Sequence, residues 1–259
     1  MEYTIVSRDD DKSREIAKCI ESKLKIAKNQ TNPEIVIAIG GDGTILKAVH
    51  LYKNSIIFGI HTGHLGFYAN YDCDDVLVLI DDINNNKFKI DELDILEAEF
   101  SDKNGKKIND FAMNEITLVC PPRTIRLDVS IDNEYFERFR GTGLAVSTPY
   151  GSTAYNKSLD GSVVDTSLSV MQLTEIAGIN SNAYRTLQSP LILSSERSIK
   201  LEAKEKQADI FITADHITYN INDFDYVKIS YKKNAIKMAY HDHCSFLTRI
   251  SRTFIISKD

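Results

Sequence analysis

The most constraining feature of this 259-residue chain is an apolar run that ends abruptly at two glycines. Residues 35–39 are mostly β-branched, which is typical of a buried parallel strand. Gly40-Gly41-Asp42-Gly43-Thr44 follows, and then apolar residues recur at helical spacing. A strand that turns through glycines into a helix is typical of a phosphate site, because backbone N–H groups and the helix N-terminus attract anions.

Asp42 is an unexpected residue in such a turn, because its carboxylate repels a bound phosphate. Its position therefore indicates a chemical role, either as a general base or through a metal ion. The alternative interpretation is a tight strand–helix turn in which an aspartate caps the helix.

The composition limits the classes of protein that need to be considered. The net charge is −6 and the isoelectric point is about 5.6, which argues against a general nucleic-acid-binding protein. We expect no membrane span, since no apolar run approaches the roughly 20 residues needed. We expect no signal peptide, since the first residues lack the basic and apolar regions of one. Cys19, Cys73, Cys120 and Cys244 are scattered, which favours a reducing compartment and disfavours structural zinc. We therefore expect a cytoplasmic protein.

The pattern of predicted elements changes near residues 90–95. Before it, strands (3–6, 34–39, 55–60) alternate with helices (12–28, 43–51, 74–83), which predicts a parallel sheet with crossover helices. After it, short strands and polar turns dominate, with one helix predicted over 169–178. The predicted strands are 95–100, 111–119, 125–131, 135–139, 199–202, 209–213, 217–221, 226–230 and 236–240. The expected fold class is α/β, with a β-rich second part.

Three further segments are candidates for ligand binding. His61-Thr62-Gly63-His64-Leu65-Gly66-Phe67-Tyr68 follows a predicted strand, where open parallel sheets bind ligands, and its aromatic pair suits a base. The alternative is a rigid loop with core aromatics; a zinc site is disfavoured because a third ligand is missing at usual spacing. Asn114-Glu115 interrupts an apolar strand pattern, and a ribose diol would satisfy both polar groups; the alternative is a strand end at the surface.

Residues 140–158 are rich in glycine and hydroxyl side chains, which permit close contact with a polar ligand; the alternative is a polar turn cluster. Asp215-His216 offers a further acid or base, although such a pair is more often structural.

Together these segments resemble the NAD kinase family, most closely its short members from Gram-positive bacteria. The resemblance covers nearly the whole chain in the same order, whereas Gly-Gly-Asp-Gly-Thr alone also occurs in diacylglycerol and sphingosine kinases. It implies an α/β phosphate-donor-binding domain (1–93, rejoined by 235–259) and a β-rich, β-sandwich-like NAD-binding domain (94–234). It also implies a homotetramer or homodimer that transfers a phosphoryl group from ATP or polyphosphate to the adenosine-ribose 2′-hydroxyl of NAD. Mg²⁺ or another divalent ion would accompany ATP.

The resemblance also implies roles for individual residues. Asp42 would be the base, and no residue is expected to be a dedicated metal ligand. The phosphates would be cradled by Gly40, Gly41, Gly43 and Thr44. The residues expected to bind NAD are Asp42, Gly43, Phe67, Tyr68, Asn114, Glu115, Arg140, Thr142, Tyr150, Thr153, Ala154, Tyr155, Ser158, Ala177, Tyr184, Asp215 and His216.

The chain departs from the family pattern at several positions, of which Thr142 is the one expected at the nicotinamide ribose end of the site. Thr142 replaces an aspartate, Tyr150 replaces a serine, Asp160 interrupts a glycine pair, and Asp165-Thr166 replaces His-Pro. Because the base and the ribose-binding pair are retained, we expect catalysis to survive and NAD affinity to change. The alternative is a catalytically weak dinucleotide-binding regulatory protein. A lipid kinase is disfavoured because the chain lacks a basic amphipathic membrane-binding face.

Overall fold

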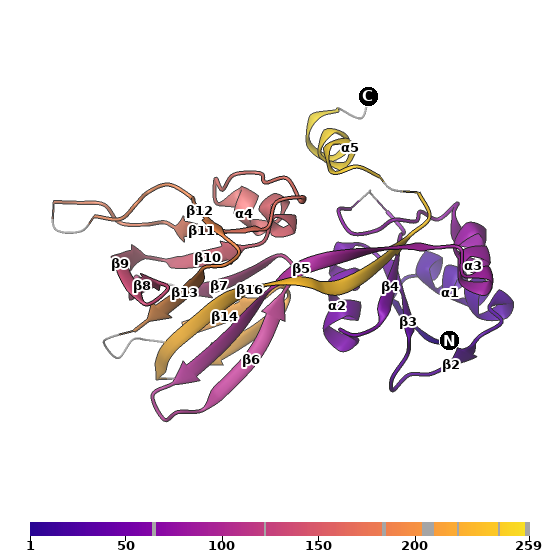
Figure 1. Cartoon of the computed structure of the whole chain (residues 1–259), viewed down its shortest axis with the longest axis horizontal. Helices are drawn as coiled ribbons and strands as arrows, with labels where there is room; N and C mark the ends of the chain where they lie inside the picture. Colours follow the sequence, from indigo (N-terminus) through magenta and orange to yellow (C-terminus); the bar gives the residue numbers. More distant parts are fainter. Residues whose placement is uncertain are drawn as a thin grey trace. The chain divides into compact units, whose positions relative to one another are not determined.

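The computed structural model describes residues 1–63, 66–121, 123–182, 185–203, 210–221, 223–242 and 244–256. The chain forms two compact units, Met1–Leu93 with Asn234–Asp259 and Asp94–Lys233 (Figure 1). The boundaries between the units fall inside two long strands, β5 (Lys89–Asp102) and β16 (Phe224–Tyr240). Each of these strands therefore contributes residues to both units.

The first unit is built on a parallel sheet, as the alternating pattern predicts. Its strand order is β2 (Ala27–Lys28), β1 (Glu2–Ser7), β3 (Ile35–Gly40), β4 (Ile56–His61) and the final part of β16. All four neighbouring pairs are parallel. The carboxyl ends of β3 and β4 are adjacent, with Gly40 opposite His61, so the two loops that follow these strands start side by side.

Helices cover both faces of this sheet, because side chains along a strand alternate in direction. On one face, Ile37, Ile39 and Phe58 pack with apolar residues of α1 (Asp11–Lys23) and α3 (Val76–Asn85). On the other lies α2 (Asp42–Leu51), whose Ile45 approaches so closely that a Cβ on Gly59 would lie 2.7 Å from it. Figure 1 shows α2 across the sheet from α1 and α3.

The first helix is shorter than the predicted range 12–28, which is a correction. It ends at Lys23, because Leu24 takes an extended backbone conformation while its N–H still bonds to Ile20. Ala27 and Lys28 then pair with β1 as an edge strand. The apolar stripe of the helix continues into Leu24, so periodicity alone did not reveal that tertiary packing ends the helix early.

The second unit is β-rich, as predicted, and surrounds one apolar core. One antiparallel sheet has the order β12 (Leu191–Ser194), β11 (Val170–Ile176), β10 (Gly143–Ser147), β7 (Glu115–Val119), β14 (Ile210–Ala214) and β15 (Ile217–Ile221). The other strands are β16, β13 (Ser198–Glu202), β8 (Ile125–Ile131), β9 (Glu134–Gly141), β5 and β6 (Lys107–Ala112). Side chains from both sets, including Leu118, Val146, Leu127 and Phe139, share the core.

Residues 169–178 were expected to form a helix, and this prediction is wrong. They contain strand β11, which pairs with β10 on one side and β12 on the other. The apolar residues fit a helical spacing, but both faces of the strand are buried. Gln172 and Thr174 are satisfied there by hydrogen bonds to Ser162 and Asn156, so polar residues occupy buried positions that the pattern assigned to solvent.

Two other boundaries also differ from prediction. The predicted strand 111–119 is divided between β6 and β7, and the break places Asn114 between them. The predicted strands 226–230 and 236–240 are parts of the single strand β16.

After β16 the chain forms a short helical segment, α5 (Phe246–Ile250) followed by the π-helical turn η2 (Ser251–Ile255), which the pattern analysis missed. None of the helices in the described part of the chain has the length and apolar character required to cross a membrane.

Truncation of Phe58 tests the core of the first unit. This fully buried ring contacts Tyr71 and Phe88, with centroid separations of 6.0 and 4.9 Å. We expect Phe58→Ala to lower the free energy of unfolding by about 3–5 kcal/mol, because the lost contacts leave a cavity. Denaturant unfolding measures this change. The control Leu77→Ala removes a side chain that is 59% exposed, and a comparable loss there would contradict the assignment of the core.

Candidate functional site

The glycine turn of the first unit closes tightly on one side and is open on the other. A Cβ on Gly40 would lie 2.3 Å from the Thr44 hydroxyl, so this position requires glycine. Cβ atoms on Gly41 and Gly43 would meet none of the described residues within 4 Å. Gly41 is the N-cap of α2 and makes no side-chain cap bond. The turn therefore offers accessible backbone beside the positive end of a helix, as a phosphate site requires.

Asp42 is the first residue of α2, and its carboxylate is fixed by the loop after β4. The backbone N–H groups of Phe67 and Tyr68 donate to its two oxygen atoms at 2.8 and 3.2 Å. Gly66 approaches so closely that a Cβ there would lie 2.2 Å from Asp42 Oδ1. The loop and the turn are thus brought together, and the carboxylate is oriented by backbone groups rather than by a side-chain cation.

The C-terminal segment, Phe246–Ile255, also contacts this loop, and the sequence analysis did not predict it. The Arg249 guanidinium donates to the carbonyl oxygens of Gly66 and Ala69 at 2.9 and 2.8 Å. The rings of Phe67 and Phe254 stack with their centroids 5.8 Å apart. No sequence pattern marks Arg249, because its helix is short and its burial depends on the contacts of the folded chain. His64 and Leu65, which belong to the predicted motif, lie outside the described residues.

In the second unit, Asn114 is fixed from both sides. The Asp215 carboxylate accepts hydrogen bonds from the backbone N–H groups of Met113 and Asn114 at 2.9 and 2.8 Å. The Asn114 carbonyl accepts one from Thr148 N–H at 2.9 Å. A Cβ on Gly151 would lie 2.0 Å from that carbonyl oxygen, so the glycine permits this close approach. Three predicted segments thus meet here, and Asp215 has a structural role within the unit.

Glu115 lies beside this junction and is buried, with 8% of its surface exposed. Its Oε2 atom has no hydrogen-bond partner within the described part of the chain. Burial, together with the charge of Asp215, raises the pKa of Glu115 to about 8, against a hydrogen bond from the Tyr155 backbone that lowers it. A buried acceptor without a partner costs free energy, so this atom is suited to a ligand hydroxyl.

The remaining predicted residues of the second unit lie on several elements. The 3₁₀ turn η1 (Tyr150–Thr153) and the short helix α4 (Tyr155–Ser158) carry Tyr150, Thr153, Ala154, Tyr155 and Ser158. Thr142 joins β9 to β10 and donates its N–H to Ile176, next to Ala177. Arg140 lies in β9, and His216 is exposed beside Asp215 in the turn after β14. Tyr184 lies outside the described residues.

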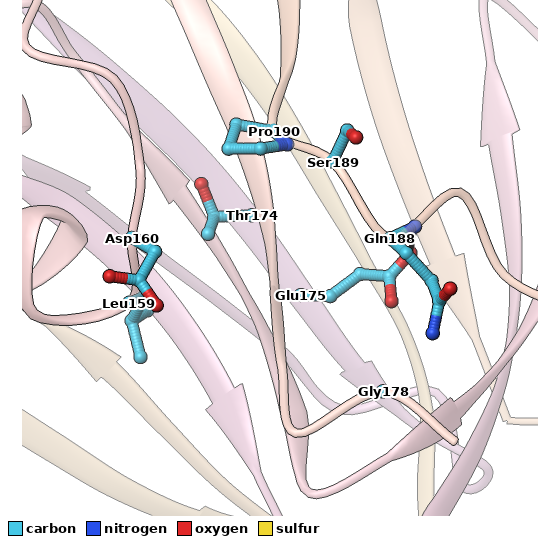
Figure 2. A pocket seen from close by; sticks show the side chains of 8 residues that line it. All are labelled: Leu159, Asp160, Thr174, Glu175, Gly178, Gln188, Ser189 and Pro190. Carbon is cyan, nitrogen blue, oxygen red and sulfur yellow. Dashed lines mark hydrogen bonds between the residues drawn. The ribbon is translucent and has the colours of Figure 1, made fainter. Parts of the chain in front are cut away.

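A pocket of about 240 Å³ opens next to α4. Figure 2 shows Asp160 and Leu159 on one side and Glu175, Gln188 and Ser189 on the other. The Glu175 carboxylate is already engaged, since it accepts hydrogen bonds from Thr186 Oγ1 at 2.7 Å and Gln188 N–H at 3.0 Å. The residues lining the pocket do not include the predicted contacts, although Ser158 and Ala177 are their chain neighbours.

An open glycine turn bearing an oriented carboxylate has the parts that a phosphotransferase acting on an alcohol requires. Two family models match the chain, the ATP-NAD kinase N-terminal domain over residues 4–88 and the ATP-NAD kinase C-terminal domain over residues 113–240. NAD kinases from Staphylococcus saprophyticus and Staphylococcus aureus are 39% and 37% identical to it over 269 residues, covering 100% of this chain and 99% of each relative. The chain belongs to the NAD kinase family.

Solved structures support the same fold. Yeast NADH kinase complexed with NADH matches with a TM-score of 0.84 and 20% identity, covering 99% of this chain and 88% of that one. An NAD kinase from Archaeoglobus fulgidus in complex with ATP matches with a TM-score of 0.71 and 20% identity, covering 97% of this chain and 95% of that one. The predicted family, fold class and enzyme class are therefore confirmed, and the lipid-kinase interpretation is not supported.

The raised pKa of Glu115 predicts a specific dependence of stability on pH. Between the ordinary carboxyl pKa and about 8, the folded protein holds a proton that the unfolded chain has lost. The free energy of unfolding therefore falls as pH rises through this window, by at most about 1.4 kcal/mol per pH unit. We expect Glu115→Gln to remove this contribution in urea unfolding from pH 5 to 9. The exposed control Glu134→Gln should keep the wild-type slope, and an unchanged slope in Glu115→Gln would refute the assignment.

Proposed function

We propose that the protein transfers the γ-phosphoryl group of ATP to the 2′-hydroxyl of the adenosine ribose of NAD, with Asp42 as the general base. The observation that carries this proposal is the oriented Asp42 carboxylate at the start of α2, beside open glycine backbone. A ribose hydroxyl is a weak nucleophile at neutral pH. A positioned base typically contributes ~10²–10⁴-fold to such a reaction.

The first unit supplies the phosphate-binding turn in this proposal. Backbone N–H groups of the turn and the dipole of α2 stabilise negative charge on the donor phosphates. Gly40, Gly41, Gly43 and Thr44 form the cradle. Both hydrogen bonds to Asp42 come from main-chain donors, so the carboxylate keeps lone pairs that can accept the proton of a substrate hydroxyl.

The second unit supplies most of the NAD contacts. Asn114 and the Oε2 atom of Glu115, which has no hydrogen-bond partner among the residues that the structure describes, suit the hydroxyls of a ribose. A Glu115 that is protonated near neutral pH offers both a donor and an acceptor, which suits a diol. The further contacts proposed are Phe67 and Tyr68 from the first unit, and Arg140, Thr142, Tyr150, Thr153, Ala154, Tyr155, Ser158, Ala177, Tyr184, Asp215 and His216.

A divalent ion such as Mg²⁺ is expected to accompany ATP. The described residues hold no cluster of three or more His, Cys, Asp or Glu side chains arranged to bind a metal. Mg²⁺ in nucleotide sites uses few protein ligands and is bound mainly through phosphate oxygens and water. When bound, it would supply charge neutralisation around the transferred group. Polyphosphate, which carries the same oxygen atoms, is the alternative donor.

We also propose a cytoplasmic homo-oligomer, a homotetramer or a homodimer. The scattered free cysteines support a reducing compartment. Several large apolar side chains of the second unit are exposed, including Tyr135, Leu187 and Ile192, which supports association with further copies.

Replacement of the base tests the proposed reaction. We expect Asp42→Asn to lower the rate of NADP formation from NAD, ATP and Mg²⁺ at least ~10²-fold, because the amide does not accept the proton. NAD binding should be largely retained, since Asn keeps one acceptor oxygen for the loop. A coupled assay with an NADP-specific dehydrogenase measures turnover, and calorimetry measures binding.

The control Asp74→Asn makes the same change at an exposed position of the first unit and should leave turnover unaltered. Near-normal turnover in Asp42→Asn would remove Asp42 from the role of base. A wild-type protein that binds NAD but forms no NADP with either donor would favour the alternative of a regulatory dinucleotide-binding protein.

The departure at Thr142 generates a second test. We expect Thr142→Asp to tighten NAD binding by about tenfold, because a carboxylate accepts hydrogen bonds from ribose hydroxyls more strongly than a threonine does. Calorimetric titration with NAD measures the dissociation constant. Thr124→Asp adds the same charge at an exposed position of this unit and serves as the control. A dissociation constant that is unchanged or weaker would show that this contact is not used.

A further inference from the structure

The C-terminal segment of the first unit contacts the loop that orients Asp42. Arg249 of α5 is only 6% exposed. Its Nη1 atom donates to the carbonyl oxygens of Gly66 and Ala69, and its Nη2 atom donates to Asn70 Oδ1 at 2.6 Å. One guanidinium group therefore spans residues 66–70.

This loop presents different backbone groups to its two neighbours. Carbonyl oxygens at its two ends face Arg249, whereas the N–H groups of Phe67 and Tyr68 between them face the Asp42 carboxylate. The fit is tight, because a Cβ on Gly66 would lie 2.2 Å from Asp42 Oδ1. A shift of the loop would therefore move the donors that orient the carboxylate.

The chemistry of the contact requires arginine. The planar guanidinium carries donors on two terminal nitrogens and reaches three separate acceptors, which a lysine ammonium centred on one atom matches poorly. Burial lowers the pKa of Arg249, while Cys244 and Asp42 act in the opposite direction, and arginine remains charged. The negative charge of Asp42 is thus one of the groups that compensate this buried cation.

We infer that Arg249 is a positioning residue for phosphoryl transfer, holding residues 66–70 so that Phe67 and Tyr68 orient the Asp42 carboxylate. The inference rests on the proposed role of Asp42 as the base. The stacking of Phe254 on Phe67 supports it, because the same C-terminal segment then fixes the loop at a second point.

The test compares Arg249→Met and Arg249→Lys with the wild-type full-length protein. We expect Arg249→Met to accelerate amide hydrogen exchange at Phe67 and Tyr68 and to lower kcat roughly 10–100-fold, as expected for a displaced catalytic group. Arg249→Lys should fall between wild type and Arg249→Met. The matched control is Arg252→Met, an exposed arginine three residues further along the same segment, which should change neither readout.

A double-mutant cycle separates positioning from general destabilisation. If Arg249 acts through Asp42, Arg249→Met should lower the residual kcat of Asp42→Asn by less than about twofold, because coupled residues are not additive. Losses that multiply in full would assign Arg249 a purely structural role and overturn the inference. Unchanged exchange or normal kcat in Arg249→Met would also overturn it. Should that variant fail to fold, Arg249→Lys provides the same two readouts.

The proposed function fails in a distinguishable way. A wild-type protein without NADP formation, measured before any variant, overturns both the function and this inference. Active wild type with near-normal Asp42→Asn removes the base and the inference together. Active wild type, impaired Asp42→Asn and normal Arg249→Met overturn the inference alone.

Discussion

The acceptance of two consecutive backbone N–H groups by one aspartate carboxylate is the interaction that fixes a loop in each of the two units. In the first unit, Asp42 binds the N–H groups of Phe67 and Tyr68. In the second unit, Asp215 binds those of Met113 and Asn114. Main-chain donors next to each other cannot rotate apart, so each pair fixes its carboxylate and loop together. Charge-assisted bonds of this kind are stronger than neutral ones, which suits loops that must keep one conformation.

The two aspartates use this interaction for different ends. Asp42 is the reactive group of the proposed mechanism, and the loop serves it. Asp215 fixes the loop by accepting hydrogen bonds from Met113 and Asn114. Its charge also adds to the effect of burial in raising the pKa of Glu115. The Tyr155 backbone donates a hydrogen bond to the Glu115 carboxyl group, and the Oε2 atom of Glu115 has no partner among the described residues. The second unit thus leaves this acceptor unsatisfied beside a rigid frame, as expected where a ligand completes the bonding.

Much of this arrangement could be predicted from the sequence, because it depends on local patterns. The apolar run before Gly40 defined β3, the glycine turn defined the start of α2, and the alternation of elements defined the parallel sheet. Residues whose position depends on distant contacts could not be found in this way. Arg249 lies in a short helical segment without an amphipathic stripe, and its partners are about 180 positions away in the sequence. Strand β11 was mistaken for a helix because Gln172 and Thr174 find buried partners that no pattern of polar and apolar residues reveals.

Positions 160 and 161 differ in the side chains that their backbone and surroundings accept. Asp160 has a φ of 58°, a left-handed conformation that glycine adopts at little cost and that aspartate tolerates better than most other residues. At Gly161, by contrast, a Cβ would lie 2.2 Å from the buried Asn156 side chain, so this position requires glycine. The Asn156 side chain donates to the Ser162 carbonyl oxygen and accepts from the Thr174 hydroxyl, so glycine at position 161 preserves two hydrogen bonds that anchor α4. Position 160 therefore accommodates a side chain, whereas the packing around Asn156 excludes one at position 161.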